Sequence, residues 1–154
     1  MRRTMDTVGA LRQVFIFKDV PEDVLELVAK AAEDTTVSAG DTIVAVGETP
    51  HALFVIRNGT VRVLPEGGKT PAVLFGTGET IGEVSLIDGG PAGGTATALE
   101  RVDLIVLRAS RLKEVLAGNP TAGHQLFRAV ARSLAGRLRR AVGMIALAKE
   151  REGG

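Results

Sequence analysis

The stretch IGEVSLIDGGPAGGTAT, residues 81–97, decides the fold of this chain and raises the question of its function. It begins with an acid between apolar residues, Glu83, continues into a loop with four glycines and a proline, and ends in alternating Thr-Ala-Thr. Successive backbone N–H groups in such a loop can converge on an anion. The stretch contains no Lys or Arg. The sequence therefore predicts either an anion-binding loop that works without a cationic side chain or one that no longer binds anions.

The composition is that of one soluble globular domain. The 154 residues are 45% hydrophobic and 24% charged, and a chain of this length can bury a core. No apolar run approaches the roughly 20 residues of a membrane helix, and residues 1–13 lack the apolar region of a signal peptide. The absence of cysteine excludes disulfides and thiolate metal sites. We therefore expect a cytoplasmic protein without membrane contact.

Residues 35–109 carry the pattern of a small β-barrel. Short apolar or alternating segments are separated by glycine-containing turns, and we expect strands at 41–46, 52–57, 60–64, 71–75, 95–100 and 102–107. Asn58-Gly59 predicts a two-residue hairpin turn, because both positions accept a positive φ. Short strands at near-regular spacing are typical of a sandwich or a barrel.

Helical patterns flank this β region on both sides. Residues 8–33 are expected to be helical, with Pro21 at a first helical position. A short helix is expected at 110–117. A long helix is expected at 119–149, because the Asn-Pro pair at its start supplies a capping residue and a first-turn proline.

The long helix carries two apolar ridges. Alternating spacings of four and three define a coiled-coil seam of about three heptads, formed by Phe127, Ala131, Leu134, Leu138, Ala141, Ile145 and Ala148. Leu126, Val130 and Val142 form a second ridge that suits packing on the barrel. We expect the seam to join two copies of the chain. The alternative is that the helix folds back wholly onto its own domain.

The positive charge of the chain is concentrated in this helix. From Asn119 onward there are seven basic and two acidic residues, although the net charge of the whole chain is only +1. A basic segment can bind nucleic acid. The chain has five Phe but no Tyr or Trp, which argues against a platform on which bases stack. A solvated helix face is the preferred interpretation.

Three motifs, in this order, resemble the cyclic nucleotide-binding domain family of the catabolite-activator and protein kinase A regulatory-subunit type. They are AGDTIVAVGETPHALFVIRNGTVRVL at 39–64, GTGETIGEVSLIDGGP at 76–91, and TATALERVDLIVL at 95–107. The resemblance implies a mainly β fold, an eight-stranded jelly-roll β-barrel (double-stranded β-helix) with flanking helices. The implied divisions are an N-terminal helical segment at 1–34, the barrel at 35–109, and C-terminal helices at 110–154 with the dimerisation helix at 119–149.

The resemblance also implies where a ligand would bind. In relatives, the residues that correspond to Gly82 and Glu83 meet the ribose, and the glutamate accepts a hydrogen bond from the 2′-hydroxyl. The cyclic phosphate is held by backbone N–H groups and by an arginine nine residues beyond that glutamate, where this chain has Ala92. The phosphate contacts expected here are the N–H groups around Gly93, Gly94 and Thr95, together with the Thr95 hydroxyl.

The base side of the expected site is formed by two other segments. By strand alternation, Ala72 and Leu74 would line it, and the resemblance places Arg137 or Leu138 of the long helix over the base. Arg137 would lie closer to the base than to the phosphate, so we do not expect it to replace the missing arginine. Gly93 lacks the hydroxyl that cGMP-selective relatives often carry there, which favours cAMP over cGMP.

No arrangement of side chains indicates an enzyme, a cofactor or a metal site. Ser110 and Ser133 lack the neighbouring His and acid that nucleophilic catalysis needs. His51 and His124 have no partner at a spacing typical of metal ligands. We therefore expect a non-enzymatic protein.

Two functional hypotheses remain. In the first, the chain senses a cyclic nucleotide, with cAMP favoured, and transmits the signal through the C-terminal helix. In the second, the replacement of the arginine by Ala92 marks a degenerate domain that binds no ligand and acts as a dimeric protein–protein interaction module. Both expect a homodimer and a protein partner. DNA is not an expected partner, because only KEREGG follows Ala148 and a catabolite activator needs a helix-turn-helix there.

Overall fold

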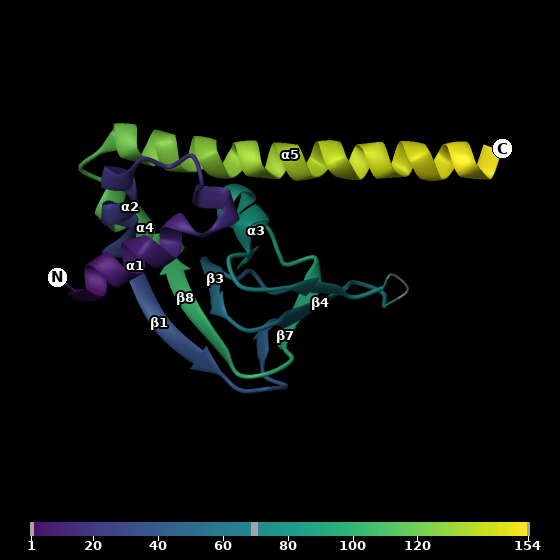
Figure 1. Cartoon of the computed structure of the whole chain (residues 1–154), viewed down its shortest axis with the longest axis horizontal. Helices are drawn as coiled ribbons and strands as arrows, with labels where there is room; N and C mark the ends of the chain where they lie inside the picture. Colours follow the sequence, from purple (N-terminus) through teal and green to yellow (C-terminus); the bar gives the residue numbers. More distant parts are fainter. Residues whose placement is uncertain (1, 69–70, 154) are drawn as a thin grey trace.

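The computed structural model describes residues 2–68 and 71–153, and it contains two four-stranded antiparallel sheets (Figure 1). One sheet has the strand order β1-β8-β3-β6 and the other β2-β7-β4-β5. The strands are β1 (Ala32–Val37), β2 (Thr42–Val44), β3 (Ala52–Asn58), β4 (Val61–Pro65), β5 (Val73–Phe75), β6 (Thr80–Ile81), β7 (Gly94–Ala98) and β8 (Val102–Arg108). This arrangement confirms the mainly β jelly-roll fold that the sequence predicts.

The Asn58-Gly59 turn joins the two sheets instead of closing a hairpin, which corrects the sequence-based expectation. β3 pairs with β6 and β8, whereas β4 pairs with β5 and β7. Gly59 has a φ of +119°, and a Cβ there would lie 2.9 Å from the carbonyl oxygen of Arg101. The N–H of Leu99 donates to the carbonyl of Thr60 at 3.0 Å. The corner between β3 and β4 therefore packs against the corner between β7 and β8, and only glycine fits at this contact.

The N-terminal segment is helical as expected, but it is divided into three short elements that end at Ala29 rather than at residue 33. They are α1 (Arg2–Arg12), the 3-10 helix η1 (Phe15–Phe17) and α2 (Glu22–Ala29). Pro21 precedes α2 with an extended ψ of 151°, and proline has no N–H with which to continue a helix. The N–H of Phe15 donates to the carbonyl of Gly78 at 3.1 Å, which ties η1 to the barrel.

β1 and β6 are strands that the sequence pattern did not reveal. β1 pairs with β8 from Ala32↔Leu107 to Val37↔Val102 and forms an edge of its sheet. Its sequence, AEDTTV, is mostly exposed and so lacks a run of alternating apolar residues. β6 has two residues, too few to form a pattern.

The core has two parts, and β8 separates them. Inside the barrel, Val102, Leu104 and Val106 of β8 pack with buried residues of both sheets. On the other face of β8, Ile105 and Leu107 join the cluster formed by the N-terminal helices, α4 (Ala109–Leu116) and the first half of α5 (Pro120–Gly153). Both faces of β8 are therefore covered, and the helices pack on the barrel through this strand and through Leu53 and Val55 of β3.

The long helix α5 is divided between a packed half and a free half. Its start is capped as expected, with the N–H of Ala122 donating to Oδ1 of Asn119 at 3.0 Å. Its buried residues all lie in the first half and are Ala122, Leu126, Ala129, Val130 and Ser133. From Leu138 to Gly153 every residue is exposed, and the helix continues past α3 (Glu83–Asp88) and ends beyond the sheets (Figure 1). The ridge containing Leu126 and Val130 thus packs on the domain, while the distal part of the seam stays free.

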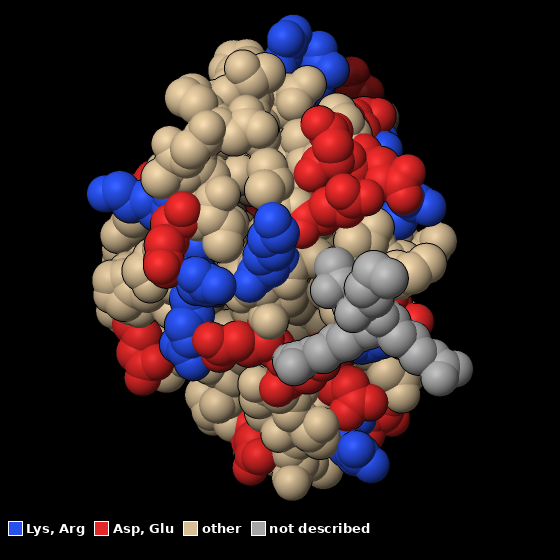
Figure 2. All heavy atoms as spheres, turned by 90° about the vertical axis from the view of Figure 1, so that its left-hand side faces the viewer, with Lys and Arg blue, Asp and Glu red and all other residues tan. Residues whose placement is uncertain are grey.

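The end of the molecule that carries α1, α2 and β1 has side chains of both charges (Figure 2). Arg12 pairs with Glu22 at 2.7 Å, and Arg108 pairs with Glu33 at 3.3 Å. The charges on this face neutralise one another locally, so the face does not suggest a strongly charged partner. None of the described helices combines the length and apolar character needed to cross a membrane.

Candidate functional site

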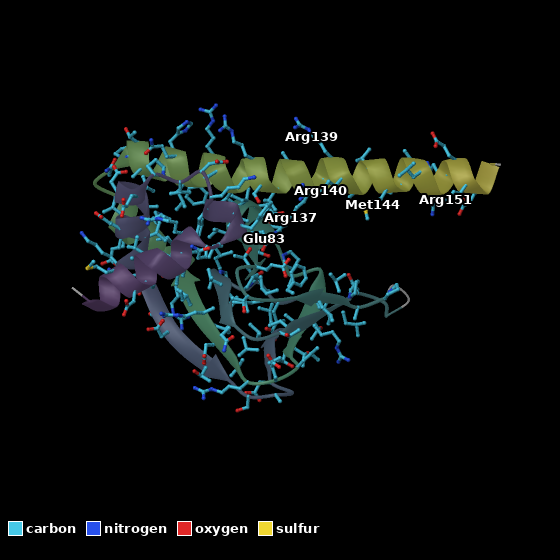
Figure 3. The ribbon with its side chains drawn as sticks, viewed as in Figure 1. Glu83, Arg137, Arg139, Arg140, Met144 and Arg151 are labelled. Carbon is cyan, nitrogen blue, oxygen red and sulfur yellow. The ribbon has the colours of Figure 1, made fainter. Side chains whose placement is uncertain are left out.

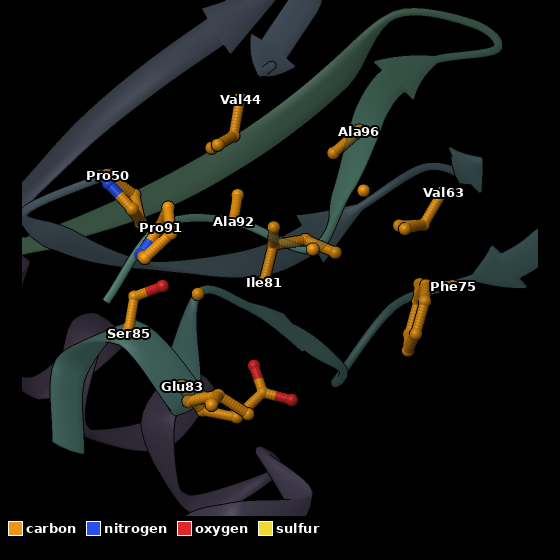
Figure 4. Close-up of a pocket in the computed structure, with 14 residues that line it drawn as sticks. Val44, Pro50, Val63, Phe75, Ile81, Glu83, Ser85, Pro91, Ala92 and Ala96 are labelled. Atoms are coloured by element: carbon orange, nitrogen blue, oxygen red, sulfur yellow. The ribbon is translucent and has the colours of Figure 1, made fainter. Parts of the chain in front are cut away.

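A pocket of about 370 Å³ lies between α3 and the β2-β7-β4-β5 sheet (Figure 4). Its walls come from the β6–α3 junction, the glycine-rich loop before β7, and the inner faces of β2, β4, β5 and β7. The lining residues are Val44, Pro50, Val63, Phe75, Ile81, Gly82, Glu83, Val84, Ser85, Pro91, Ala92, Gly93, Gly94 and Ala96. The walls are mainly apolar, and Glu83 is the only ionisable residue among them.

The backbone at Gly82 places Glu83 at this pocket. Gly82 is the residue before α3, with a φ of +93°, and a Cβ there would lie 2.8 Å from the carbonyl oxygen of Ala52. Side chains rarely adopt this conformation, and the contact with β3 leaves no space for one. The turn brings Glu83 into the first position of α3, where it is buried. Oγ1 of Thr80 donates to Oε2 of Glu83 at 3.2 Å.

The glycine-rich loop is tied to the chain on both sides of the pocket. The N–H of Ala92 donates to the carbonyl of Glu48 at 2.8 Å, and the N–H of Gly47 donates to the carbonyl of Ala92 at 2.9 Å. A Cβ at Gly94 would lie 2.8 Å from the carbonyl oxygen of Leu64. The loop therefore has a defined path against the β2–β3 connection and β4.

Four of the expected site residues come together in the pocket, and Ala92 lies beside them. Gly82 and Glu83 line one side, and Gly93 and Gly94 line another. Thr95 is not among the lining residues, and its Oγ1 accepts a hydrogen bond from the N–H of Val46 at 3.0 Å.

Ala72 and Leu74 do not line the pocket, and Phe75 and Val63 take the place expected for them. Phe75 pairs with Val61 and lies on the inner face, so Leu74 points outward and is 60% exposed. The sequence-based alternation was therefore off by one residue on β5. Val61 and Val63 alternate with exposed Arg62, and pairing them with β5 is the signal that could have identified Phe75.

Arg137 reaches the site from α5 without lining the pocket. Its guanidinium forms an ion pair with Oε1 of Glu83 (Figure 3). The side chains are only 27% and 10% exposed, respectively. The guanidinium carbon also lies 5.8 Å from the centre of the Phe15 ring. The resemblance led us to expect Arg137 over the base, whereas the structure places it on the carboxylate expected to bind the sugar.

The site contains no cationic side chain at the expected phosphate position. Ala92 occupies that position and packs against the cluster inside the barrel. Within residues 2–68 and 71–153 there is no group of three His, Asp or Glu side chains that could hold a metal. The polar groups that the pocket offers a ligand are therefore the Glu83 carboxylate, the Ser85 side chain and backbone groups.

The structure is a jelly-roll domain with a pocket between the short α3 and one sheet, and with the long α5 packed beside it. The chain belongs to the cyclic nucleotide-binding domain family, because residues 34–119 match the family described as "Cyclic nucleotide-binding domain". It is similar to the "CRP-like cAMP-activated global transcriptional regulator" of Mycobacterium tuberculosis, with 28% identity over 127 residues. That match covers 80% of this chain and 57% of the relative, so the chain spans little more than half the length of that regulator.

Solved structures show the same fold. A cyclic nucleotide-binding domain from Methylobacillus flagellatus matches with a TM-score of 0.77 and 21% identity, covering 94% of this chain and 83% of that one. The regulatory subunit of a cAMP-independent protein kinase A from Trypanosoma brucei matches with a TM-score of 0.71 and 20% identity, covering 86% of this chain and 46% of that one. A triple variant of that subunit, in which one change is threonine to arginine, is described as bound to cAMP in its A site.

Proposed function

We propose that the chain is a non-enzymatic regulatory module that binds a cyclic nucleotide in the pocket between α3 and the β2-β7-β4-β5 sheet. The observation that carries the proposal is the position of Glu83. Its carboxylate lies in the same pocket as the backbone of residues 92–94, at the first position of α3. Membership of the cyclic nucleotide-binding domain family supports this class of ligand.

The pocket suits one orientation of the ligand. The ribose would lie at Glu83, the cyclic phosphate at the backbone of Gly93 and Gly94, and the base along Val63 and Phe75. The Thr95 hydroxyl accepts a hydrogen bond from Val46, and its own O–H remains able to donate to a phosphate oxygen. cAMP is the preferred ligand, because Gly93 offers no hydroxyl to a guanine.

The affinity is expected to be low. A hydrogen bond to a charged group contributes about 1.5–3 kcal/mol, so the absence of an arginine at position 92 weakens binding by about 10- to 100-fold. The Trypanosoma brucei regulatory subunit offers a parallel, because it is described as cAMP-independent and its variant that gains an arginine is described as bound to cAMP. In this chain the backbone of the glycine-rich loop and the Thr95 hydroxyl would hold the phosphate without a cationic side chain.

Transmission of the signal is proposed to run through α5. Helix α3 contacts α5, and the Glu83–Arg137 ion pair is part of that contact. Beyond Arg137, exposed Leu138 and Ile145 continue the heptad seam. We propose that this free half pairs with the same segment of a second copy, so that a shift of α3 alters the geometry of a homodimer that a protein partner reads.

A second candidate function is a dimeric protein–protein interaction module that binds no ligand. The observation that favours it is the combination of Ala92 with a pocket lining that has a carboxylate and no cation. Such a lining repels a phosphate unless the loop backbone compensates.

Titration calorimetry with cAMP and cGMP, carried to millimolar ligand, separates the two functions. The regulatory module predicts a saturable isotherm for cAMP, weaker than micromolar, and a still weaker one for cGMP. A flat trace for both nucleotides would favour the interaction module.

A further inference from the structure

Both carboxylate oxygens of Glu83 already have partners within the chain. Oε1 pairs with the guanidinium of Arg137, and Oε2 accepts the hydrogen bond from Thr80. We propose that Arg137 controls access to the sugar end of the pocket, so that α5 and a ribose hydroxyl compete for the same carboxylate. This inference rests on the proposed function and adds a specific rule of regulation to it.

The geometry makes this ion pair more than a surface contact. Three separate elements meet there, because Arg137 comes from α5, Glu83 from α3 and Phe15 from η1. Phe15 is held to the barrel by its N–H bond to Gly78. Exposed ion pairs contribute little because water screens them, but the Glu83 carboxylate is buried and the Arg137 guanidinium is largely covered.

Arg137 also marks the boundary between the packed and the free halves of α5. Residues 138–153 are all exposed, and Arg137 is the last residue of the helix that is not. The ion pair therefore lies at the point where α5 leaves the cover of the domain along the described chain. If the ion pair opens, the part of α5 that is free of the domain extends towards the N-terminus of the helix.

Competition for Glu83 gives a specific rule of ligand selection. A ligand with a 2′-hydroxyl must compete with Arg137 and Thr80 for the acceptor sites of Glu83. We propose that it does so at the expense of the charge-assisted bond from Arg137. A ligand without this hydroxyl leaves the pair intact. The wild-type protein should therefore distinguish cAMP from 2′-deoxy-cAMP only weakly. By linkage, the ligand weakens the Arg137 contact by the same factor by which Arg137 weakens the ligand.

The first test measures the affinities for cAMP and 2′-deoxy-cAMP by calorimetry in wild type, Arg137→Gln and Arg139→Gln. Arg139 is the matched control, because it lies on the same helix but points away from Glu83 (Figure 3). Arg137→Gln should raise the affinity for cAMP by about tenfold and widen its ratio to 2′-deoxy-cAMP by a similar factor. Arg139→Gln should change neither. Weaker binding of cAMP by Arg137→Gln would overturn the proposal, because Arg137 would then be a direct ligand contact.

The second test needs no ligand and separates this inference from the proposed function. Hydrogen exchange should be faster in residues 83–88 and around 134–140 in both Glu83→Gln and Arg137→Gln, but unchanged in Arg139→Gln. Unchanged exchange in β8 shows that the variants are folded. If neither the wild type nor any variant binds cAMP, the proposed function fails. The exchange rates then still decide whether the Glu83–Arg137 ion pair holds α5 against α3. Exchange rates equal to those of wild type in both variants would overturn the inference.

Discussion

Thr80 and Glu83 form a buried hydrogen bond, in which Oγ1 of the threonine donates to Oε2 of the carboxylate at 3.2 Å. Both side chains are at least nine-tenths buried. The bond links β6 to the first turn of α3, across Ile81 and Gly82, where the chain turns into the helix. A carboxylate at this depth needs partners for both of its oxygens, and Thr80 supplies one of them from within the same segment.

Thr80→Val should lower the free energy of unfolding by about 1.5 kcal/mol, because it keeps the shape of the side chain and removes a hydrogen bond to a charged group. Urea denaturation measures this change. Thr80→Ser retains the hydroxyl and is the control, with a smaller loss expected from the missing methyl group. Equal losses in the two variants would show that packing, rather than the bond to Glu83, is what Thr80 contributes.

Gly82→Ala should destabilise the fold by about 2–3 kcal/mol, because it places a side chain in a backbone conformation that costs about 1–3 kcal/mol and too close to another backbone group. The φ of Gly82 is +93°, and the added Cβ would lie 2.8 Å from the carbonyl oxygen of Ala52. Gly93 provides a matched control in the same pocket, since its φ is not positive and a Cβ would have nothing within 4 Å. Gly93→Ala should leave stability nearly unchanged by chemical denaturation. A similar loss for both variants would contradict this account.

Ala92→Arg should raise the affinity for cAMP by about 10- to 100-fold, because it restores a cation where the phosphate is proposed to lie. The measurement is calorimetry on the intact chain. Ala92→Gln is the control, since it adds a long polar side chain without a charge and should give a much smaller gain. If the arginine variant binds no better than the glutamine variant, the phosphate does not lie at this loop.

The sequence could predict the turns and the carboxylate, because these depend on local features. Glu83 was identified from its own segment, and the resemblance to the family added Gly82 and the expected ribose contact of both residues. The structure places both at the pocket. Which strands pair with one another in the two sheets could not be predicted in this way. Asn58-Gly59 has the local signature of a hairpin, but the choice between a hairpin and a sheet-to-sheet corner depends on which distant strand β4 joins.

The ion pair between Arg137 and Glu83 could not be predicted from sequence patterns either. Arg137 and Glu83 are separated by 54 positions, and their contact depends on how α5 lies across α3 and η1. The lining role of Phe75 depends on the register between β4 and β5, and a shift by one residue exchanges Leu74 for Phe75. Side-chain direction on a short strand is therefore the least predictable feature of this site.

The free half of α5 should join two copies of the chain, and the seam can be tested without disturbing the fold. Leu138→Glu combined with Ile145→Glu places charges on the proposed interface, and both residues are exposed in the single chain, at 65% and 57%. Analytical ultracentrifugation should show a dimer for wild type and a monomer for this variant, with unchanged thermal stability of the monomer's barrel.

Leu147→Glu is the control for that prediction, because Leu147 is equally exposed, at 57%, but lies off the heptad seam. In a two-stranded coiled coil, only the seam positions meet the partner helix directly, so this variant should remain dimeric. A wild-type protein that is monomeric at all concentrations would contradict the homodimer. Loss of the dimer in all variants, including Leu147→Glu, would indicate an interface broader than the seam, because apolar area rather than heptad position would then hold the two helices together.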